Sequence, residues 1–283
     1  MANKTIQNTH LQVFPYQEAF LAVQRTLDSA TRLSESELAT AVVPYDFPPS
    51  VTVAGSDEHL YAKLVDVAMY SGIASTKVTE RLPSIRRHFA DFRVVAQYTE
   101  QQVHDILKDN AMLKHPAKVR ACVSNAKRFV NILAKNASIA EYFNTFGPFD
   151  TDERLQRFRD ALIAKFSFLG GTTVYHYMME LKLPVAKPDR VLRRVFHRLG
   201  LTADPHLKRE SDELTEHLWS VVQEARAFAK AAAKNIRLVD ITFMGFGQEE
   251  IVEFGLEGTC LEDHPKCHQC QAVEFCTMPQ IAT

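Results

Sequence analysis

The chain has 283 residues, of which 46% are hydrophobic and 24% are charged, a balance typical of a folded globular protein and not of intrinsic disorder. The 10 glycines and 12 prolines exclude a collagen-like or low-complexity chain, and a net charge of −1 means that any basic surface must be local. No apolar run is long enough to span a membrane, and the N-terminus lacks the apolar core of a secretory signal.

The first third of the chain is predicted to be helical after an irregular start. Residues 1–62 mix short helical pieces with the proline-rich segment 44–49, which cannot lie inside a helix. Residues 61–69 are rich in apolar side chains, and residues 76–92 space their apolar side chains as a helix does. This part of the sequence therefore predicts a helical lobe that begins near residue 63.

The rest of the chain continues the helical pattern. Thr99 is expected to cap the start of one helix, and either Thr151 or Asp152 that of another. Pro116 is expected in the first turn of a long helix. No stretch of alternating β-branched residues stands out, so the chain is predicted to be all-α. The further predicted helices cover residues 172–181, 189–199, 210–234 and 236–254.

Four of the five cysteines lie close together near the C-terminus, with the spacing C-x6-C-x2-C-x5-C. Four thiolates in so short a segment need a cation or a metal cluster to offset their charge. Zinc and a 4Fe–4S cluster are the two candidates, although structural zinc sites usually pair two C-x2-C knuckles and only one is present here. The predicted metal ligands are Cys260, Cys267, Cys270 and Cys276.

A glycine hairpin connects two predicted helices, and an acidic residue, Asp189, follows at the start of the next helix. Backbone N–H groups at a helix N-terminus bind a phosphate without reading sequence. Residues 182–198 contain six Lys or Arg against one acid, which adds positive charge beside this hairpin. The candidate DNA-binding residues are Gly170, Gly171, Thr172, Thr173, Lys187 and Arg190.

These motifs together resemble the helix-hairpin-helix (HhH-GPD) DNA glycosylase superfamily. The cysteine spacing is similar to the iron–sulfur loop of the endonuclease III group, and the segments 89–127 and 168–170 are similar to 3-methyladenine glycosylase I. The resemblance implies a two-lobed all-α fold with a C-terminal 4Fe–4S cluster. One lobe would span residues 63–187, and the other would combine residues 1–62 with 188–283.

The resemblance also implies roles for single residues. Asp189 would be the catalytic carboxylate, because it would stabilise the positive charge that develops on the sugar as the base leaves. The alternative is that Asp189 only caps a helix, as aspartate often does. Tyr70, Ser71 and Tyr175 lie on segments expected to border the pocket of a flipped base.

Three departures from the family pattern matter. Phe168 stands where the first glycine of the usual hairpin would be. Thr172 stands where bifunctional members of the endonuclease III group carry the lysine that forms a Schiff base, so the chain is expected to lack lyase activity. The segment 70–75 contains no glutamine to fill the gap left by a flipped base.

The sequence therefore predicts a monofunctional DNA N-glycosylase that excises a damaged or modified base from double-stranded DNA and leaves an abasic site. Its substrates would be alkylated purines or modified pyrimidines, the latter extending to bulky hypermodified phage cytosines in a defence role. The alternatives are a non-catalytic DNA-binding iron–sulfur protein and a zinc-stabilised scaffold that binds protein. The expected setting is a cytoplasmic monomer associated with the nucleoid and not with a membrane.

Overall fold

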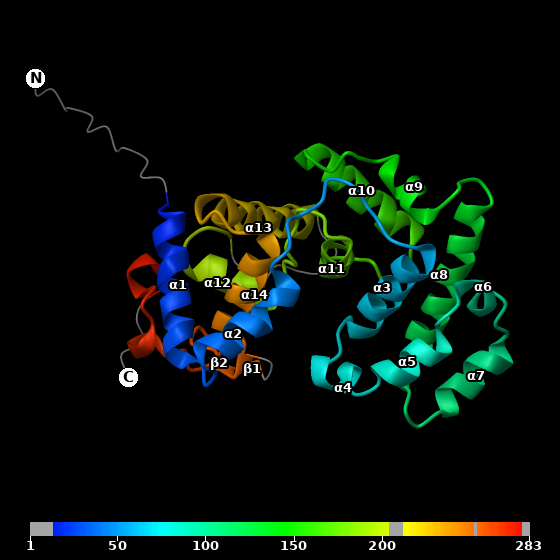
Figure 1. Cartoon of the computed structure of the whole chain (residues 1–283), viewed down its shortest axis with the longest axis horizontal. Coiled ribbons are helices and arrows are strands. Elements are labelled where there is room, and N and C mark those ends of the chain that lie inside the picture. Colours follow the sequence, from blue (N-terminus) through cyan, green and yellow to red (C-terminus); the bar gives the residue numbers. More distant parts are fainter. Residues whose placement is uncertain (1–13, 204–211, 252–253, 279–283) are drawn as a thin grey trace, which may run out of the picture.

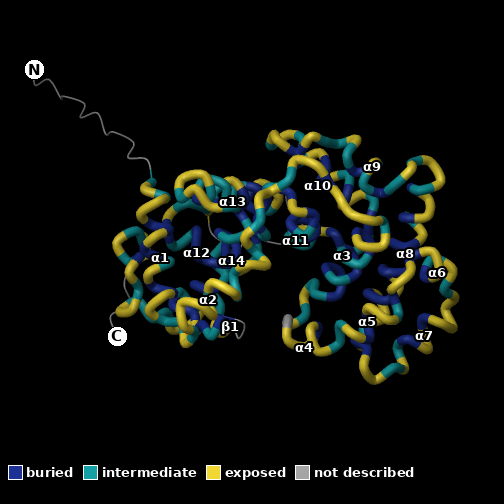
Figure 2. Tube along the Cα trace, in the orientation of Figure 1, coloured by how far each residue is buried: buried dark blue, intermediate teal, exposed yellow. Residues whose placement is uncertain are grey.

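The computed structural model describes residues 14–203, 212–251 and 254–278, and within them the chain is built almost entirely of helices (Figure 1). The helices form two lobes that lie side by side, and each lobe encloses a hydrophobic core (Figure 2). The predicted helical fold is confirmed in this coarse sense. The chain ends 1–13 and 279–283, which the second predicted lobe includes, lie outside the described residues. No described helix is both long and apolar enough to cross a membrane.

The first lobe is formed by the middle of the chain. Aromatic rings fill its core, where Tyr61, Phe92 and Phe129 lie with ring centroids 5.5 to 5.8 Å apart. Such edge-on contacts add to the stabilisation that apolar burial provides. The helices of this lobe are α3 (Asp57–Tyr70), α4 (Ser75–Thr79), α5 (Leu82–His88), α6 (Phe92–Val95), α7 (Glu100–Lys108), α8 (Pro116–Leu133), α9 (Ile139–Asn144), α10 (Asp152–Lys165) and α11 (Thr172–Glu180).

The second lobe joins the start of the chain to its C-terminal part. Phe196, Phe228 and Phe243 meet at its centre, with ring centroids 4.7 to 5.4 Å apart. Its elements are α1 (Tyr16–Ala30), α2 (Glu35–Val42), the 3-10 turn η1 (Val43–Tyr45), α12 (Arg190–Arg198), α13 (Asp212–Ala231), α14 (Ile236–Gly247), β1 (Glu250–Ile251), β2 (Leu256–Glu257), and the 3-10 turns η3 (Cys267–Gln269) and η4 (Val273–Phe275).

Helix α13 joins the two lobes. The Trp219 ring of α13 stacks on Tyr175 of α11 with the centroids 6.3 Å apart, and Trp219 and Val222 belong to the first hydrophobic core. Leu60 and Tyr61, which precede residue 63, also belong to that core. The first core therefore draws on segments from both sides of the predicted lobe boundaries.

The predicted helix starts are confirmed. Thr99 caps α7 in a capping box with Gln102, and the Thr151 side chain accepts a hydrogen bond from the Arg154 N–H at the start of α10. Pro116 is the first residue of α8, where its missing N–H costs no helical hydrogen bond.

The helix predicted over residues 76–92 is instead divided into α4, α5 and α6. Pro83 lies in the first turn of α5 and cannot donate a hydrogen bond to the preceding turn. Phe89 ends α5 with φ of −120° and ψ of 28°, outside the helical region. The apolar spacing continues through both breaks, which is why the sequence pattern does not reveal them.

The all-α prediction is wrong at a short hairpin. The helix predicted over residues 236–254 ends at Gly247, and β1 and β2 then pair antiparallel. The chain returns so closely that a Cβ on Gly258 would lie 2.0 Å from the Gln248 carbonyl oxygen, so only glycine fits there. Strands of two residues are too short to show an alternating pattern.

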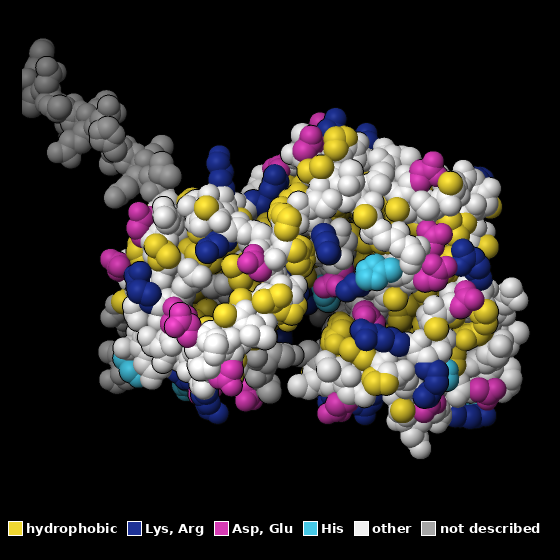
Figure 3. Space-filling model, viewed as in Figure 1, with side chains coloured by type: hydrophobic (Ala, Val, Ile, Leu, Met, Phe, Trp, Pro, Cys, Tyr) yellow, Lys and Arg dark blue, Asp and Glu magenta, His cyan; other side chains and the backbone are white. Residues whose placement is uncertain are grey.

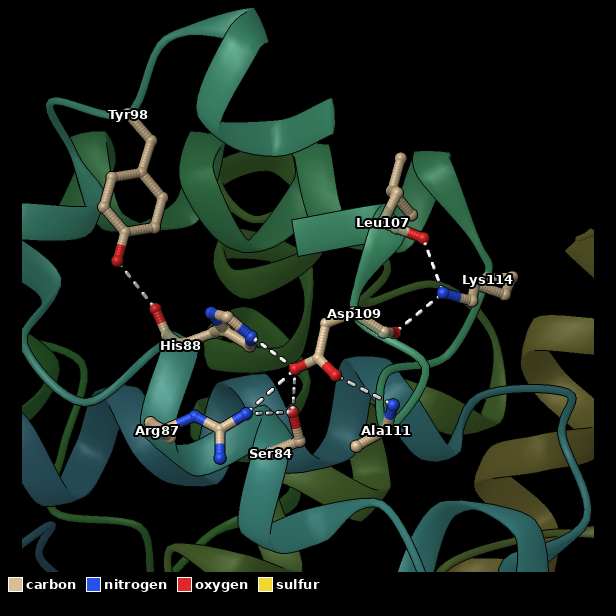
Figure 4. A network of polar contacts seen from close by, with 8 residues as sticks. All are labelled: Ser84, Arg87, His88, Tyr98, Leu107, Asp109, Ala111 and Lys114. Atoms are coloured by element: carbon tan, nitrogen blue, oxygen red, sulfur yellow. Dashed lines mark hydrogen bonds and ion pairs between the residues drawn. The ribbon is translucent and has the colours of Figure 1, made fainter. Parts of the chain in front are cut away.

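A polar network around Asp109 fixes the outer end of the first lobe (Figure 4). Its Oδ2 atom accepts hydrogen bonds from Ser84 Oγ at 2.7 Å, Arg87 at 2.9 Å and His88 Nε2 at 2.9 Å. The Asp109 Oδ1 atom accepts from the Ala111 N–H at 2.9 Å. One carboxylate therefore ties α5 to the loop between α7 and α8.

We expect Asp109→Asn to lower the melting temperature at pH 7. The His88 hydrogen bond first, then the Ala111 N–H and Ser84, hold the pKa of Asp109 well below its usual range. The ionised carboxylate therefore stabilises the fold above about pH 4, and this stabilisation is lost as the pH falls. Thermal melts followed by circular dichroism from pH 7 to pH 3 should show the gap between wild type and variant narrowing with acid. A gap independent of pH would contradict this role.

Candidate active site and metal centre

The glycine hairpin leaves the start of α11 open. Gly171 is the N-cap residue with φ of 53°, a conformation that favours glycine, and no side chain caps the helix. A Cβ added at Gly170 or Gly171 would meet no atom within 4 Å. The Thr173 N–H donates to the Gly170 carbonyl at 3.0 Å, and the space beside the two glycines leaves room for a phosphate at the start of α11.

Phe168 takes the left-handed conformation that a glycine would supply in the usual hairpin, with φ of 63°. Its ring lies 5.0 Å from the Lys118 ammonium and 6.2 Å from the His115 ring. Lys118 is buried, which lowers its pKa to about 8, and its Nζ donates to the Ser71 carbonyl at 2.6 Å. Lys118 thus ties the end of α3 to the hairpin.

Asp189 lies at the N-cap of α12, as the alternative interpretation expects. Its Oδ1 atom accepts from the Val191 N–H at 2.9 Å and the Leu192 N–H at 3.2 Å. The side chain is half-buried, and within the described ranges its Oδ2 atom takes part in no hydrogen bond. One oxygen therefore holds the helix start while the other is free for chemistry, so capping and catalysis are compatible.

A second acid, Asp240 on α14, supports the segment before Asp189. Asp240 Oδ1 accepts from the Lys187 N–H at 3.1 Å, and its Oδ2 accepts from Arg237 at 2.7 Å. Burial, more than the neighbouring charge of Asp189, raises the pKa of Asp240 to about 6. Asp240 was not among the predicted site residues, although an acid within the apolar sequence of α14 is a signal for such a role.

Two of the three predicted pocket residues lie beside the hairpin. The Ser71 hydroxyl is 3.3 Å from the Thr173 hydroxyl, and the Tyr70 ring lies 6.5 Å from that of His176. Tyr175 differs from the expectation: it is 1% exposed, and its hydroxyl accepts from Arg159 at 3.1 Å. Because Tyr175 points into the core of the first lobe, it does not border the pocket.

The four C-terminal cysteines line a single cavity of about 220 Å³ between α12, the end of α14 and the cysteine segment. Burial, together with the other three cysteines, raises the pKa of Cys270 to about 11. Arg198 of α12 donates to Cys260 Sγ at 3.3 Å. These thiols need a cation in the cavity to ionise, and Arg198 supplies positive charge beside one of them.

The shape of this cavity bears on what it can hold. Across the described ranges, no group of three or more His, Cys, Asp or Glu side chains is arranged to hold a metal ion. The four cysteines instead surround an open volume. Four-cysteine ligation around such a volume fits a polynuclear iron–sulfur cluster, which spaces its thiolates more widely than one tetrahedral zinc does.

The basic segment 182–198 serves partly internal roles. Arg194 donates to the Gly247 and Cys260 carbonyls, and Arg198 donates to the Leu261 carbonyl at 2.6 Å. These two arginines hold the cysteine segment against α12. Arg190 is exposed and Lys187 is half-buried, so the positive charge nearest Asp189 remains open to solvent.

Residues 51–182 match the sequence model of the methyladenine glycosylase family. This match confirms the resemblance to DNA glycosylases and covers the lobe that carries the hairpin. Asp189 and the four cysteines lie beyond its C-terminal end.

Three solved structures illustrate the structural similarity. The 3-methyladenine DNA glycosylase I of Staphylococcus aureus is 16% identical over 50% of this chain and 85% of its own, with a TM-score of 0.42. The 8-oxoguanine DNA glycosylase of Thermotoga maritima is 15% identical over 81% of this chain and 95% of its own, with a TM-score of 0.49. The endonuclease III of a trapped covalent intermediate with DNA is 13% identical over 87% of this chain and 96% of its own, with a TM-score of 0.49.

Proposed function

We propose that this protein is a monofunctional DNA N-glycosylase that excises a damaged or modified base from double-stranded DNA. Two observations carry the proposal: α11 begins at Gly171 without a side-chain cap, and the second oxygen of Asp189 bonds no residue that the structure describes. The family match over residues 51–182 supports the same function. The enzyme would act as a monomer on the chromosome, in the cytoplasm.

The chemistry follows from these two features. The hairpin binds a DNA phosphate, and the target base turns out of the duplex into the space between the lobes. As the bond from C1′ to the base nitrogen breaks, Asp189 Oδ2 stabilises the positive charge on the sugar. A water molecule then forms the new C1′–O bond, gives its proton to Asp189, and leaves an abasic site. The base nitrogen keeps the electron pair of the broken bond and takes up a proton.

The absence of lyase activity is part of the proposal. A lyase step requires an amine that attacks C1′ and forms a Schiff base. Thr172, a half-buried residue in the first turn of α11, stands in the position of that amine. Borohydride should therefore trap no covalent complex between this protein and abasic DNA.

We also propose that the four cysteines hold a 4Fe–4S cluster. Their shared cavity and the adjacent Arg198 support this assignment over a single zinc ion. When bound, such a cluster supplies structural support for the segment 260–276. Asp189 and the hairpin provide the groups that act on DNA.

We expect Gly170→Val to weaken binding to duplex DNA by about tenfold or more, because a hydrogen bond to a charged group contributes about 1.5–3 kcal/mol. The added Cβ would meet no protein atom within 4 Å, so the fold should tolerate it, but the side chain would occupy the space for the phosphate. Fluorescence anisotropy with an undamaged duplex measures the affinity, and a thermal melt checks the fold. Unchanged affinity with an unchanged melting temperature would argue against a phosphate site at the hairpin.

A base-release screen tests the proposed function. Duplexes that each contain one defined modified base would be incubated with excess enzyme, and free base would be measured by mass spectrometry. Release of alkylated purines or of modified pyrimidines, including hypermodified phage cytosines, would separate the two substrate classes and the defence role. Tight binding without release from any duplex would favour a non-catalytic DNA-binding iron–sulfur protein instead.

A further inference from the structure

Charged side chains and histidine gather where the two lobes meet (Figure 3). From the first lobe, α3 and α11 contribute three residues that contact one another. Lys63 Nζ donates to Glu180 Oε2 at 2.7 Å, and His176 Nε2 lies 3.9 Å from Glu180 Oε1. The Lys63 side chain is 32% exposed, that of Glu180 is 23% exposed and that of His176 is 17% exposed. Each is therefore mostly buried but reaches the surface.

The electrostatics of this group keep Glu180 ionised and His176 neutral at pH 7. Burial raises the pKa of Glu180, but the Lys63 hydrogen bond and the charges of Lys63 and Arg237 outweigh burial and lower it. Burial is the main cause that lowers the pKa of His176 to about 3. The positive charges of Lys187, Arg237 and Lys63 lower it further, and the negative charge of Glu180 opposes them. A carboxylate that is mostly buried but reaches the surface beside a neutral imidazole offers hydrogen-bond acceptors there.

The position of Glu180 relates it to the candidate active site. The charges of Lys187 and Arg237 act on His176. Both residues bond the Asp240 carboxylate, and Lys187 precedes Asp189 by two positions. On the other side, the Tyr70 ring lies 6.5 Å from His176. The group therefore lies between the Tyr70 side of the hairpin and the start of α12.

We propose that Glu180 is a specificity-determining residue, which accepts a hydrogen bond from an N–H or O–H group of the flipped base. This inference rests on the proposed function and deepens it by naming the substrate class, a base that presents a hydrogen-bond donor to Glu180. A base without that donor would displace the water that donates to the Glu180 carboxylate and would donate no hydrogen bond in its place, so it would bind more weakly. Sites that bind a polar group reject analogues lacking that group for this reason.

The surroundings of Glu180 favour hydrogen bonding over recognition by aromatic stacking. A cationic alkylated ring is usually held between aromatic faces. Here Tyr70 offers one ring and donates or accepts through its hydroxyl at Thr79, whereas Tyr175 lies in the core. Lys63 holds the Glu180 carboxylate in place, so the carboxylate is oriented before the base arrives.

The rival interpretation is that the Lys63–Glu180 pair only connects α3 to α11. In that case its removal would change stability and leave base selectivity untouched. The Glu58–Arg93 pair is a suitable control, because it also joins α3 to another helix, with a distance of 2.6 Å, but on the α6 side. Glu58→Gln therefore removes one glutamate charge from α3 away from the site.

The test compares wild type, Glu180→Gln and Glu58→Gln in single-turnover base release. The duplexes carry pairs of bases that differ in one donor, such as 5-hydroxymethylcytosine and 5-methoxymethylcytosine, or 7-methylguanine and 7-methylhypoxanthine. The preference is the release rate of the base that carries the donor divided by that of its partner without the donor. For the pair that contains the base released fastest by wild type, Glu180→Gln should lower this ratio by about tenfold or more. Glu58→Gln should keep the wild-type preference.

Each outcome decides between the proposals. An active Glu180→Gln protein with the wild-type preference would overturn the inference and leave the proposed function standing. If wild type releases no base from any duplex, the proposed function fails and this inference fails with it. If Glu180→Gln does not fold, the double variant Lys63→Met with Glu180→Met, which removes both charges, replaces it, and the same loss of preference is expected.

Discussion

Asp189→Asn is expected to slow single-turnover base release by about 10²- to 10⁴-fold while duplex binding changes little. The Asn side-chain oxygen can still accept from the Val191 and Leu192 N–H groups, so α12 should keep its cap. The variant loses the negative charge that opposes the charge on the sugar, and it cannot take a proton from water. Quenched-flow release of the base and anisotropy with the same duplex measure the two effects.

Asp91→Asn provides the matched control. Asp91 is also an N-cap aspartate, and its side chain accepts from the Arg93 N–H at 2.8 Å at the start of α6. If capping were all that Asp189 does, the two variants should have similar, small effects on release. Normal base release by Asp189→Asn would exclude Asp189 as the catalytic carboxylate.

Local signals in the sequence predicted much of the fold and the ends of its helices. Side chains that act on their own helix, such as the Thr99 and Thr151 caps, can be read from a few neighbouring residues. The cysteine spacing likewise predicted four residues that the structure brings to one cavity. The breaks between α4, α5 and α6 were missed because the apolar spacing runs on across them.

The residues that meet between the two lobes could not be predicted in the same way. Glu180 and Lys63 lie 117 positions apart, and Lys187 and Asp240 lie 53 apart, so only the packing of the helices brings each pair together. Tyr175 shows the converse error. A position next to the hairpin in sequence says nothing about which face of α11 a side chain occupies, and Tyr175 occupies the core face.

Helix α12 connects the candidate catalytic residue to the cysteine cavity. Asp189 caps its first turn, and Arg198 in its last turn donates to Cys260 Sγ at 3.3 Å. The Arg198 carbonyl also accepts from the Thr277 N–H at 2.8 Å, just beyond the last cysteine. A shift of the cysteine segment should therefore move α12, a single nine-residue helix, and with it the Asp189 side chain at its N-terminus.

The wild-type protein is expected to contain about four irons per chain and to absorb visible light. Cys270→Ser is expected to remove most of the iron and sulfide from the purified protein, and the visible absorbance with them. The cavity of about 220 Å³ would then lack its contents, and the positive charge of Arg198 would face thiols that stay protonated. The cysteine segment should unfold, since metal binding and folding are coupled in such segments. Limited proteolysis would detect new cleavage between residues 260 and 276.

Cys122→Ala is the control for this variant, because Cys122 is 1% exposed in the first core and lies outside the cavity. It should keep the iron and the absorbance and lose only a modest amount of stability, as small buried truncations do. Zinc with no iron in the wild-type protein would contradict the cluster assignment. Full iron content in Cys270→Ser would show that Cys270 is not a ligand. The catalytic proposal for Asp189 would survive either result, because it assigns the cysteines structural support and no reacting group.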